Sequence, residues 1–593
     1  MSSLRHGSGH IMPADPGYAT TLFAVAAGVR LICALYSIIP DCDEVFNYWE
    51  PTHYITHGFG LETWEYSPKY AIRSWAYVWI HAYIITICRR LGVPEIYLFF
   101  ALRAVLGTFC AYCEAQFSLT LRRSISPVAG LLFLTFSLSS AGMFHASVTF
   151  LPSSFSMYMT MLAFSNMLDP VPNSLRGKTV STLVPFAISG ILGWPFALAV
   201  GIPYVLSLVT GIVFGPGRII YVTGIINAIF VAAAVLAAVV SMDTWIFKRL
   251  QIVPLNIVLY NVLESTAESG PDIFGTEPLT YYIKNLALNF GIVAVLAVIS
   301  PVAVVVRYLI NGSARLRLHV AYLLISSLAV WIAVFFPQPH KEERFFYVVY
   351  PIICACAALS VDSILHVYKA TAHSIKVPVK LVNHGSFFLK ISLIVVSLSY
   401  GIFRMFAYHA LYFAPLEVYG TLSIVNADIA PNDVPINVCV GREWYRFPSS
   451  YFLPSNMRLK LIKSNFDGML PAEFEDDVPW YIGASQINEG LNNLNQEEMS
   501  FYIPLDQCDY LVDSNFTTPV GPESFEAQYV ADTDNWDIVT CKPFIDSENS
   551  TLLARIFKFP DSIEKMIPPV AAKYFRRSYT SYCLLRNKQF ASD

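Results

Sequence analysis

The stretch YATTLFAVAAGVRLICALYSIIP (residues 18–40) runs directly into DCDEVFNYWEPTHY (residues 41–54), and the two together decide the fold class. The first part is apolar over the ~20 residues that a membrane-spanning helix needs. It is longer than the hydrophobic region of a signal peptide and no obviously soluble protein follows it, so we interpret it as an uncleaved first span. The second part places Asp41, Asp43 and Glu44 among aromatic residues at the membrane surface.

The whole chain has the composition of a protein with many membrane spans. Of its 593 residues, 55% are hydrophobic and 14% are charged, and the mean hydropathy is +0.49, outside the usual balance of soluble domains. The net charge of −4 offers no basic excess for nucleic acid, and the sequence contains no Gly-rich phosphate-binding motif. Polynucleotide and nucleoside-triphosphate chemistry are therefore excluded.

Apolar segments of membrane-spanning length recur along residues 18–411, and 180–214 is long enough to be a kinked pair. Clusters of Lys and Arg favour the cytosolic side, which places residues 1–17 in the cytosol and the C-terminal part in the lumen. This orientation requires an odd number of crossings, and we expect about eleven. The lumenal loops are then 41–73, 242–284 and 337–344. The segments are 18–40, 74–91, 96–120, 127–144, 147–168, 180–214, 218–241, 285–309, 319–336, 345–367 and 388–408.

One part of this topology is inconsistent. The Arg89-Arg90 pair and the Arg122-Arg123 pair both look cytosolic, although they flank the single segment 96–120. Either that segment re-enters the membrane or the charge rule fails there.

Residues 412–593 are predicted to form a soluble lumenal domain of α/β or β-rich type. INVCVGREWYRFPSSYFLP (436–454) and CDYLVDSNF (508–516) mix short β-prone runs with polar turns. Sequons at Asn515 and Asn549 lie on this lumenal side, as glycosylation requires, whereas the sequon at Asn311 lies on the cytosolic side and should be silent. No CxxC pair occurs, so zinc is not expected, and one or two disulfides with open pairing are possible among Cys439, Cys508, Cys541 and Cys583.

The acids after residue 40 have the spacing of a helix start. Asp41 is predicted as the N-cap, with Glu44 reaching back from the third helical position in a variant of the capping box. Asp43 is not needed for the cap and shares a helix face with Asn47 and Glu50. The neighbouring aromatic residues fit an interfacial belt.

A second polar cluster, QPHKEERF (338–345), contains His340, Lys341 and Arg344 on the lumenal side, against the usual distribution of positive charge. These donors suit an anionic lipid phosphate, which Arg can bind through two hydrogen bonds. Juxtamembrane anchoring is the alternative interpretation. In the loop 242–284, Asn, Tyr and Glu side chains could bind sugar hydroxyls, or the loop is an ordinary structured one.

A series of motifs over about residues 40–455 closely resembles the endoplasmic-reticulum α-1,2-mannosyltransferase family of lipid-linked oligosaccharide assembly, within glycosyltransferase family 22. They are DCDEVFNYWEPTHY, WEYSPKYAIRSWAY (64–77), FLPSSFSMY (150–158), ILGWPF (191–196), PLNIVLYNV (254–262), GTEP (275–278), QPHKEERF and CVGREWYRFPSSYFLP (439–454).

The resemblance implies a GT-C fold and an inverting transfer of mannose from dolichyl-phosphate-mannose. It implies two acceptors, the six-mannose and eight-mannose intermediates on dolichyl pyrophosphate, and a location in the endoplasmic-reticulum membrane. Separately, we expect a monomer. Inversion needs one base on the acceptor hydroxyl and stabilisation of the leaving phosphate. We assign Asp43 as the base, with Glu44 as its alternative. His340, Lys341 and Arg344 are candidates for the phosphate, and no metal or other cofactor is expected. Further substrate contacts are expected from Tyr48, Trp49, Arg73, Asn256, Tyr260 and Glu277.

One motif departs from the family pattern. MDTWIFKR (242–249) keeps Asp243 but changes the aromatic run, so roles for 244–247 stay open. A sister transferase acting on another oligosaccharide branch or on a glycosylphosphatidylinositol precursor remains the nearest alternative. A transporter would predict inverted repeats, which the sequence does not show.

Overall fold

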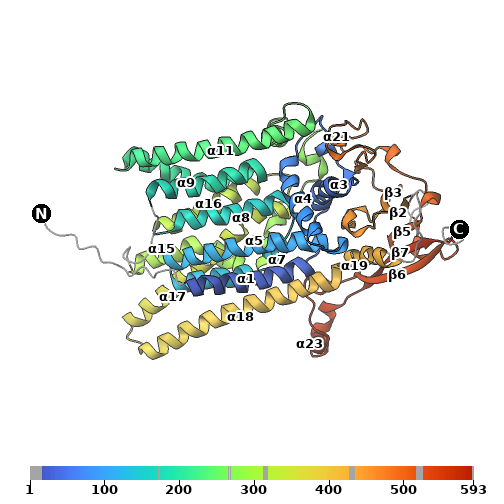
Figure 1. The fold of residues 1–593 in the computed structure, drawn as a ribbon. Coiled ribbons are helices and arrows are strands. Elements are labelled where there is room, and N and C mark those ends of the chain that lie inside the picture. Colours follow the sequence, from blue (N-terminus) through green and yellow to red (C-terminus); the bar gives the residue numbers. More distant parts are fainter. Residues whose placement is uncertain are drawn as a thin grey trace.

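The computed structural model describes residues 16–170, 174–264, 266, 269–311, 318–426, 435–515, 525 and 527–589. Long helices lie side by side in a bundle, and a domain with a β-sheet lies beyond one end of it (Figure 1). The predicted cytosolic segment 1–17 falls almost entirely outside the described residues.

Seven helices are long and apolar enough to cross a membrane, or eight if the bent pair α14 (Ile292–Val298) and α15 (Ser300–Asn311) forms one span. The shorter helices α6 (Pro127–Ser139), α8 (Pro152–Leu168) and α9 (Leu175–Ile188) pack in the same bundle. These three helices are shorter than a full span, so the described residues establish seven or eight spans, and the total of about eleven stays a prediction. The seven are α1 (Pro16–Tyr36), α5 (Glu95–Ser124), η4–α10 (Pro195–Phe214), α11 (Arg218–Phe247), α16 (Leu318–Phe335), η8–α17 (Glu343–Ser374) and α18 (Val379–Tyr412).

The segment predicted to span at 74–91 does not cross the bundle. It forms α4 (Trp75–Arg90), whose first turn donates from the Ala76 N–H to Asp243 at 3.2 Å, near the end of α11. At its other end, Arg89 donates to the carbonyl of Thr56 at 2.7 Å, in α3 (Glu50–His57). Both contacts lie at the end that carries the C-terminal domain (Figure 1), so Arg89 is not on the opposite side. With α4 removed from the count, α5 is a full span and the inconsistency disappears.

Charged side chains inside the bundle have polar partners. Glu114 is fully buried and forms an ion pair with Arg30. Arg103 donates to the carbonyls of Ser37 and Ile38 at 2.8 and 3.1 Å. A buried charge in lipid is costly unless it is compensated in this way, and the Arg103 contacts fix the chain where it leaves α1.

The first loop and the remaining connections are built from short elements. They are α2 (Cys42–Glu44), η1 (Val45–Trp49), β1 (Leu61–Glu62), η2 (Trp64–Tyr66), α7 (Ala141–Ala146), η3 (Ser189–Gly193), α12 (Val253–Val258), η5 (Leu259–Leu263), η6 (Pro271–Phe274) and α13 (Thr280–Phe290). The predicted kinked pair at 180–214 is confirmed, because the helix breaks at Trp194 between η3 and η4.

The C-terminal domain contains a five-stranded mixed sheet in the order β3-β2-β5-β7-β6. The strands are β2 (Ile436–Val440), β3 (Met457–Leu461), β5 (Tyr510–Ser514), β6 (Trp536–Ile545) and β7 (Tyr579–Asn587). β2 is parallel to both β3 and β5, while β7 is antiparallel to β5 and β6. Short helices complete the domain: α19 (Ala414–Gly420), α20 (Leu422–Val425), α21 (Trp480–Gly483), α22 (Leu552–Ile556), α23 (Asp561–Glu564) and α24 (Pro569–Ala572).

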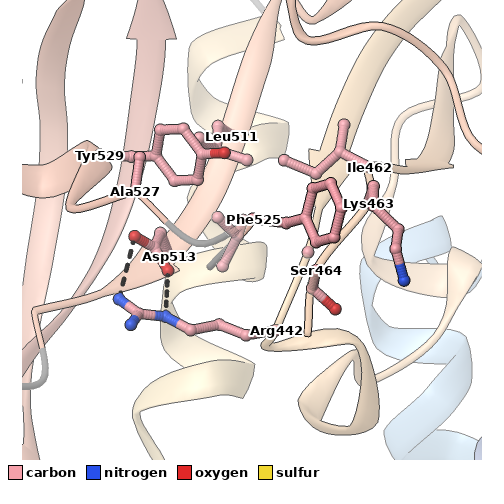
Figure 2. Close-up of a pocket in the computed structure, with 11 residues that line it drawn as sticks. Arg442, Ile462, Lys463, Ser464, Leu511, Asp513, Phe525, Ala527 and Tyr529 are labelled. Carbon is pink, nitrogen blue, oxygen red and sulfur yellow. Dashed lines mark hydrogen bonds and ion pairs between the residues drawn. The ribbon is translucent and has the colours of Figure 1, made fainter. Parts of the chain in front are cut away.

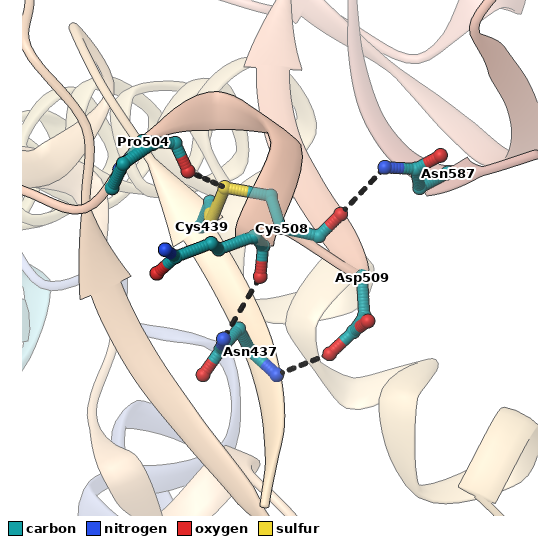
Figure 3. Close-up of a disulfide and its surroundings, with 7 residues drawn as sticks. Asn437, Cys439, Pro504, Cys508, Asp509 and Asn587 are labelled. Atoms are coloured by element: carbon teal, nitrogen blue, oxygen red, sulfur yellow. Dashed lines mark hydrogen bonds between the residues drawn. A yellow bond between two sulfur atoms is a disulfide. The ribbon is translucent and has the colours of Figure 1, made fainter. Parts of the chain in front are cut away.

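Cross-links and ion pairs hold this sheet together. Arg442 follows β2 and forms a two-bond ion pair with Asp513 of β5 beside a small pocket (Figure 2). The disulfide Cys439–Cys508 joins β2 to the chain before β5 (Figure 3), and Cys541–Cys583 joins opposite residues of β6 and β7. The prediction of one or two disulfides is confirmed as two.

The first loop and the C-terminal domain are joined directly. β1 pairs antiparallel with β4 (Ala472–Glu473). The buried carboxylate of Glu50 accepts hydrogen bonds from the Ser450 N–H and Ser450 hydroxyl, both at 2.7 Å, and from the Ser449 hydroxyl at 3.1 Å. The loop that carries the acids is therefore held against the FPSSYF segment of the C-terminal domain.

Candidate active site

The acidic stretch begins a helix, as predicted, but only one of its acids acts as a cap. Asp41 is the N-cap of α2 and accepts from the Asp43 N–H at 3.0 Å. Glu44 does not reach back to it. Its buried carboxylate accepts from the Trp49 indole and the Phe150 N–H, both at 3.0 Å. The capping box is therefore wrong, because two interior donors outcompete the helix start for this carboxylate.

Asp43 points toward the second predicted cluster. The chain continues from α2 into the π-helix η1, which changes the helical period, so Asp43, Asn47 and Glu50 do not act as one face. Asn47 accepts from the Thr63 hydroxyl at 2.7 Å, while Glu50 turns to the C-terminal domain. The Asp43 side chain retains 36% exposure.

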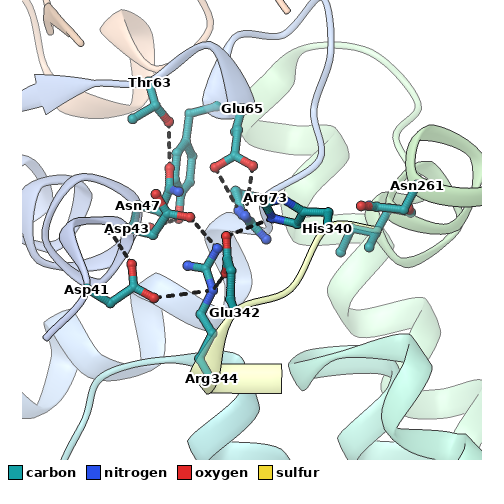
Figure 4. A network of polar contacts seen from close by, with 12 residues as sticks. Asp41, Asp43, Asn47, Thr63, Glu65, Arg73, Asn261, His340, Glu342 and Arg344 are labelled. Atoms are coloured by element: carbon teal, nitrogen blue, oxygen red, sulfur yellow. Dashed lines mark hydrogen bonds and ion pairs between the residues drawn. The ribbon is translucent and has the colours of Figure 1, made fainter. Parts of the chain in front are cut away.

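Arg344 lies at the centre of a ring of carboxylates (Figure 4). Its guanidinium is 2.5 Å from Asp43 and 3.4 Å from Asp41, and it also pairs with Glu342. His340 contacts the other oxygen of Glu342 at 2.9 Å and the Gly275 carbonyl at 2.7 Å. The structure thus brings together Asp43, His340 and Arg344, which are distant in the sequence.

Burial and the charges of this cluster shift the pKa values of the residues around Arg344. Burial raises the pKa of Asp41 to about 7, against the opposing effect of Arg344. Burial alone would raise the pKa of Glu342, but Arg344 and His340 hold it at about 2. Burial opposes the charge on His340, yet its contact with Glu342 raises the His340 pKa above the ordinary value. Glu342 is therefore a permanent counter-charge, whereas Asp41 changes charge near neutral pH.

Lys341 lies beside this ring but is engaged elsewhere. Its ammonium group donates to the carbonyls of Glu277 at 2.6 Å and of Gln338, and the side chain is buried. The Glu277 N–H donates in turn to the Pro339 carbonyl at 2.9 Å. Lys341 thus fastens the loop 242–284 to the loop 337–344, and Glu277 contributes backbone atoms to this joint while its side chain is exposed.

Arg73 extends the polar network. It forms a two-bond ion pair with Glu65, at 2.7 and 3.1 Å, and lies 5.9 Å from the ring centre of Tyr48. Burial raises the pKa of Glu65 despite Arg73, and burial also raises that of Tyr48 to about 12. Tyr48 is therefore a neutral hydrogen-bonding group at physiological pH.

The other residues predicted to contact substrate lie in supporting positions. Trp49 is fully buried, and Asn256 donates to the Ala71 carbonyl at 3.0 Å. Tyr260 packs on Trp64 with ring centres 5.2 Å apart. Sequence reasoning missed the roles of Glu65 and Glu342, although both lie inside motifs that resemble the family.

Asp41, Cys42 and Asp43 place one possible metal ligand each within 4.8 Å of one another. A cation there would compete with Arg344, which contacts both carboxylates. Burial also raises the pKa of the Cys42 thiol well above its ordinary value, which disfavours the thiolate form that binds metals. This donor set does not suit a metal ion while Arg344 is in place, and the absence of a metal from the reaction stays a prediction.

Comparison with known proteins identifies the family. The sequence pattern of the Alg9-like mannosyltransferase family matches residues 21–454. The chain belongs to the Alg9-like mannosyltransferase family. It is a mannosyltransferase, as the motifs implied, and the GT-C class of polytopic helical protein expected for such a chain is confirmed.

Similar proteins are found across eukaryotes. The α-1,2-mannosyltransferase alg9 of Schizosaccharomyces pombe is 39% identical, covering 91% of this chain and 92% of its own. The human α-1,2-mannosyltransferase ALG9 is 36% identical, covering 91% and 86%. The crystal structure of ArnT from Cupriavidus metallidurans bound to undecaprenyl phosphate has a TM-score of 0.49 at 11% identity, covering 84% of this chain and 93% of that one.

Proposed function

We propose that the protein is an inverting α-1,2-mannosyltransferase of N-glycan precursor synthesis. Its donor is dolichyl-phosphate-mannose, and its acceptors are the six-mannose and eight-mannose intermediates on dolichyl pyrophosphate. The names of the relatives, which include α-1,2-mannosyltransferases from fission yeast and human, support the linkage. The motifs of the first loop and of QPHKEERF support the donor class.

The observation that carries the proposal is the contact between Asp43 and Arg344 at 2.5 Å. It places a partly exposed carboxylate beside a guanidinium, which are the two groups that an inverting transfer from a lipid phosphate requires. Asp43 removes the proton of the acceptor hydroxyl while that oxygen attacks the mannose carbon bonded to phosphate. The bond from this carbon to the phosphate oxygen breaks, and dolichyl phosphate leaves with both bonding electrons.

Arg344 controls when Asp43 is free to act. Its guanidinium is shared among Asp43, Asp41 and Glu342. A donor phosphate competes for the same guanidinium, which binds phosphate through two parallel hydrogen bonds. Binding of the donor therefore releases Asp43 toward the acceptor. His340, whose pKa is raised by its contact with Glu342, lies beside the ring as a second candidate to bind the phosphate.

Lys341 has a different role in this proposal from the one its charge suggested. Its ammonium group already donates to backbone carbonyls of two loops. We assign it to holding those loops together and assign the phosphate to Arg344 and His340.

Features of the C-terminal domain support a lumenal orientation. Two disulfides are typical of an oxidising compartment, and Asn549 is exposed within its sequon. Asn515 is also exposed at the end of β5, while the rest of its sequon lies outside the described residues. We therefore place this domain, and with it Asp43, in the lumen of the endoplasmic reticulum.

The test is transfer by the purified protein in lipid nanodiscs with dolichyl-phosphate-mannose and each acceptor. The six-mannose and eight-mannose acceptors should each gain one α-1,2-linked mannose. Transfer only to another branch, or to a glycosylphosphatidylinositol precursor, would assign the chain to the sister activity.

The phosphate assignment is tested by comparing Arg344→Ala with Lys341→Ala. Arg344→Ala should weaken donor binding at least tenfold, since it removes charged hydrogen bonds worth about 1.5–3 kcal/mol each. Lys341→Ala should mainly lower the melting temperature. If only Lys341→Ala weakens donor binding while Arg344→Ala leaves it unchanged, the two assignments must be exchanged.

A further inference from the structure

One segment of the C-terminal domain, residues 552–577, leaves the sheet between β6 and β7. It contains α22, α23, α24 and the turn η15 (Lys573–Phe575). In Figure 1 the part labelled α23 projects sideways from the domain, next to the end of α18.

The base of this segment is fixed to a membrane-spanning helix. Arg404 of α18 donates to the carbonyls of Arg555 and Ile556 at 3.3 and 3.1 Å. The Lys558 N–H donates to the Phe403 carbonyl at 3.3 Å. Aromatic rings add to this contact, with Tyr400 on Phe557 and Phe403 on Phe559 at centre distances of 5.2 and 4.7 Å.

The position of these contacts along α18 sets their depth. α18 has 34 residues, which is about 50 Å of helix, whereas the hydrocarbon core of a bilayer is ~30 Å thick. Arg404 lies about two turns before the end of α18, close to where this helix leaves the hydrocarbon. On the same helix, Ile402 and Phe406 keep 54% and 39% exposure, so a lipid-facing apolar surface reaches the attachment point of the segment.

The part of the segment beyond its base also exposes apolar side chains. Met566 and Val570 are each 79% exposed and Tyr574 is 53% exposed. The exposed cationic side chains of Lys565 and Lys573 lie among them. Clustered exposed apolar side chains on a soluble domain indicate an interaction surface, and apolar tips flanked by Lys are typical of segments that lie in a membrane interface.

The tip is held by ion pairs at its base. Glu564, at the end of α23, accepts from Lys558 at 3.0 Å and from Arg577 at 2.6 Å. These contacts join the start, middle and end of the segment. The ion pairs therefore fix the position of its exposed apolar end within the domain.

We propose that residues 552–577 form a membrane anchor, whose tip at Met566 and Val570 inserts about 5–10 Å into the boundary between head groups and acyl chains. The occupant of this surface is lipid, because the base of the segment is attached to α18 close to where that helix leaves the hydrocarbon, next to the exposed Ile402 and Phe406. The C-terminal domain is then only partly soluble, and it is fastened to the bilayer at a second point beside α18.

The test is depth-dependent fluorescence quenching on the full-length protein in phosphatidylcholine nanodiscs. Bimane is attached to Met566→Cys, to Val570→Cys and, as the matched control, to Met499→Cys. Met499 is 60% exposed on the same domain, and the parent protein gives the background from native cysteines. Phosphatidylcholine with a nitroxide near the head group should quench bimane at 566 and 570 at least about twofold more than at 499. Aqueous iodide should instead quench bimane at 499 more than at 566 and 570.

Two results would overturn the proposal. Equal quenching by iodide at all three positions would show that the tip lies in water. Protection of positions 566 and 570 from both quenchers would show that protein, not lipid, covers the tip.

Discussion

At the scale of single residues, the site depends on how one guanidinium divides its contacts. Arg344 contacts Asp41, Asp43 and Glu342, and their different environments give these three carboxylates different properties. Glu342 stays ionised, Asp41 titrates near neutrality, and Asp43 is the most exposed of the three. Asp43 is therefore the carboxylate of the three that is most open to an acceptor hydroxyl.

The raised pKa of Asp41 predicts a pH-dependent cost to stability. Its pKa is about 7 in the folded protein and near 3.8 when unfolded, so the folded state binds the proton more tightly. The Asp41 contribution to stability is therefore greatest below pH 4 and is lost as pH rises through 7. Asp41→Asn keeps a good N-cap and removes this cost, so its melting temperature relative to the parent should rise by a few degrees between pH 5 and 8. An unchanged difference between the two pH values would contradict the assignment.

Sequence spacing predicted Asp41 as the cap and singled out Asp43, because both conclusions depend on local helix geometry. It could not predict the partner of Glu44, since the Phe150 N–H lies 106 residues away. It also gave no sign of the backbone carbonyls that surround the Lys341 ammonium group, because these come from two separate loops.

At the scale of elements, close helix contacts depend on small residues. Gly401 of α18 lies against α6, where an added Cβ would come within 1.7 Å of the Ser139 carbonyl oxygen. The hydroxyls of Ser139 and Ser397 meet beside it at 2.7 Å. Glycine and serine allow helices in membranes to approach in this way.

Gly401→Ala should therefore separate α18 from α6 and cost about 1–3 kcal/mol or more. The matched control is Gly28→Ala in α1, where an added Cβ meets nothing within 4 Å. The thermal stability of both variants in nanodiscs gives the comparison. Equal melting temperatures for the two variants would show that the α18–α6 contact is looser than described.

Most spans were predictable because a run of ~20 apolar residues has few alternatives. α4 was not, since a helix packed between the bundle and the C-terminal domain carries the same apolar composition as a span. The preference of Lys and Arg for the cytosolic side was misleading at Arg89. This side chain is held by the Thr56 carbonyl and by Glu95.

At the scale of the whole molecule, the C-terminal domain helps to position the first loop, which carries the acids. Glu50 binds Ser450 across 400 residues of sequence, and the Tyr54 hydroxyl donates to the Glu475 carbonyl at 2.6 Å. No local pattern predicts such a contact, although the FPSSYF motif that supplies Ser449 and Ser450 was recognised as similar to the family.

The proposed orientation predicts which sequons are glycosylated. Asn549→Gln should increase the gel mobility of the protein by the equivalent of one glycan, and Asn515→Gln should do the same. Asn311→Gln, at the end of α15, is the control and should change nothing. Glycosidase treatment of each variant checks the assignment. A glycan on Asn311 alone would show that the orientation is the opposite of the proposed one.

The central claim is that Asp43 is the base of the mannosyl transfer. The most direct measurement is the turnover rate of Asp43→Asn in nanodiscs, with dolichyl-phosphate-mannose and the six-mannose acceptor, alongside its melting temperature and donor affinity. The account predicts a loss of about 10²–10⁴-fold in kcat, with a folded protein and with donor binding retained. Full activity in a folded Asp43→Asn protein would contradict it.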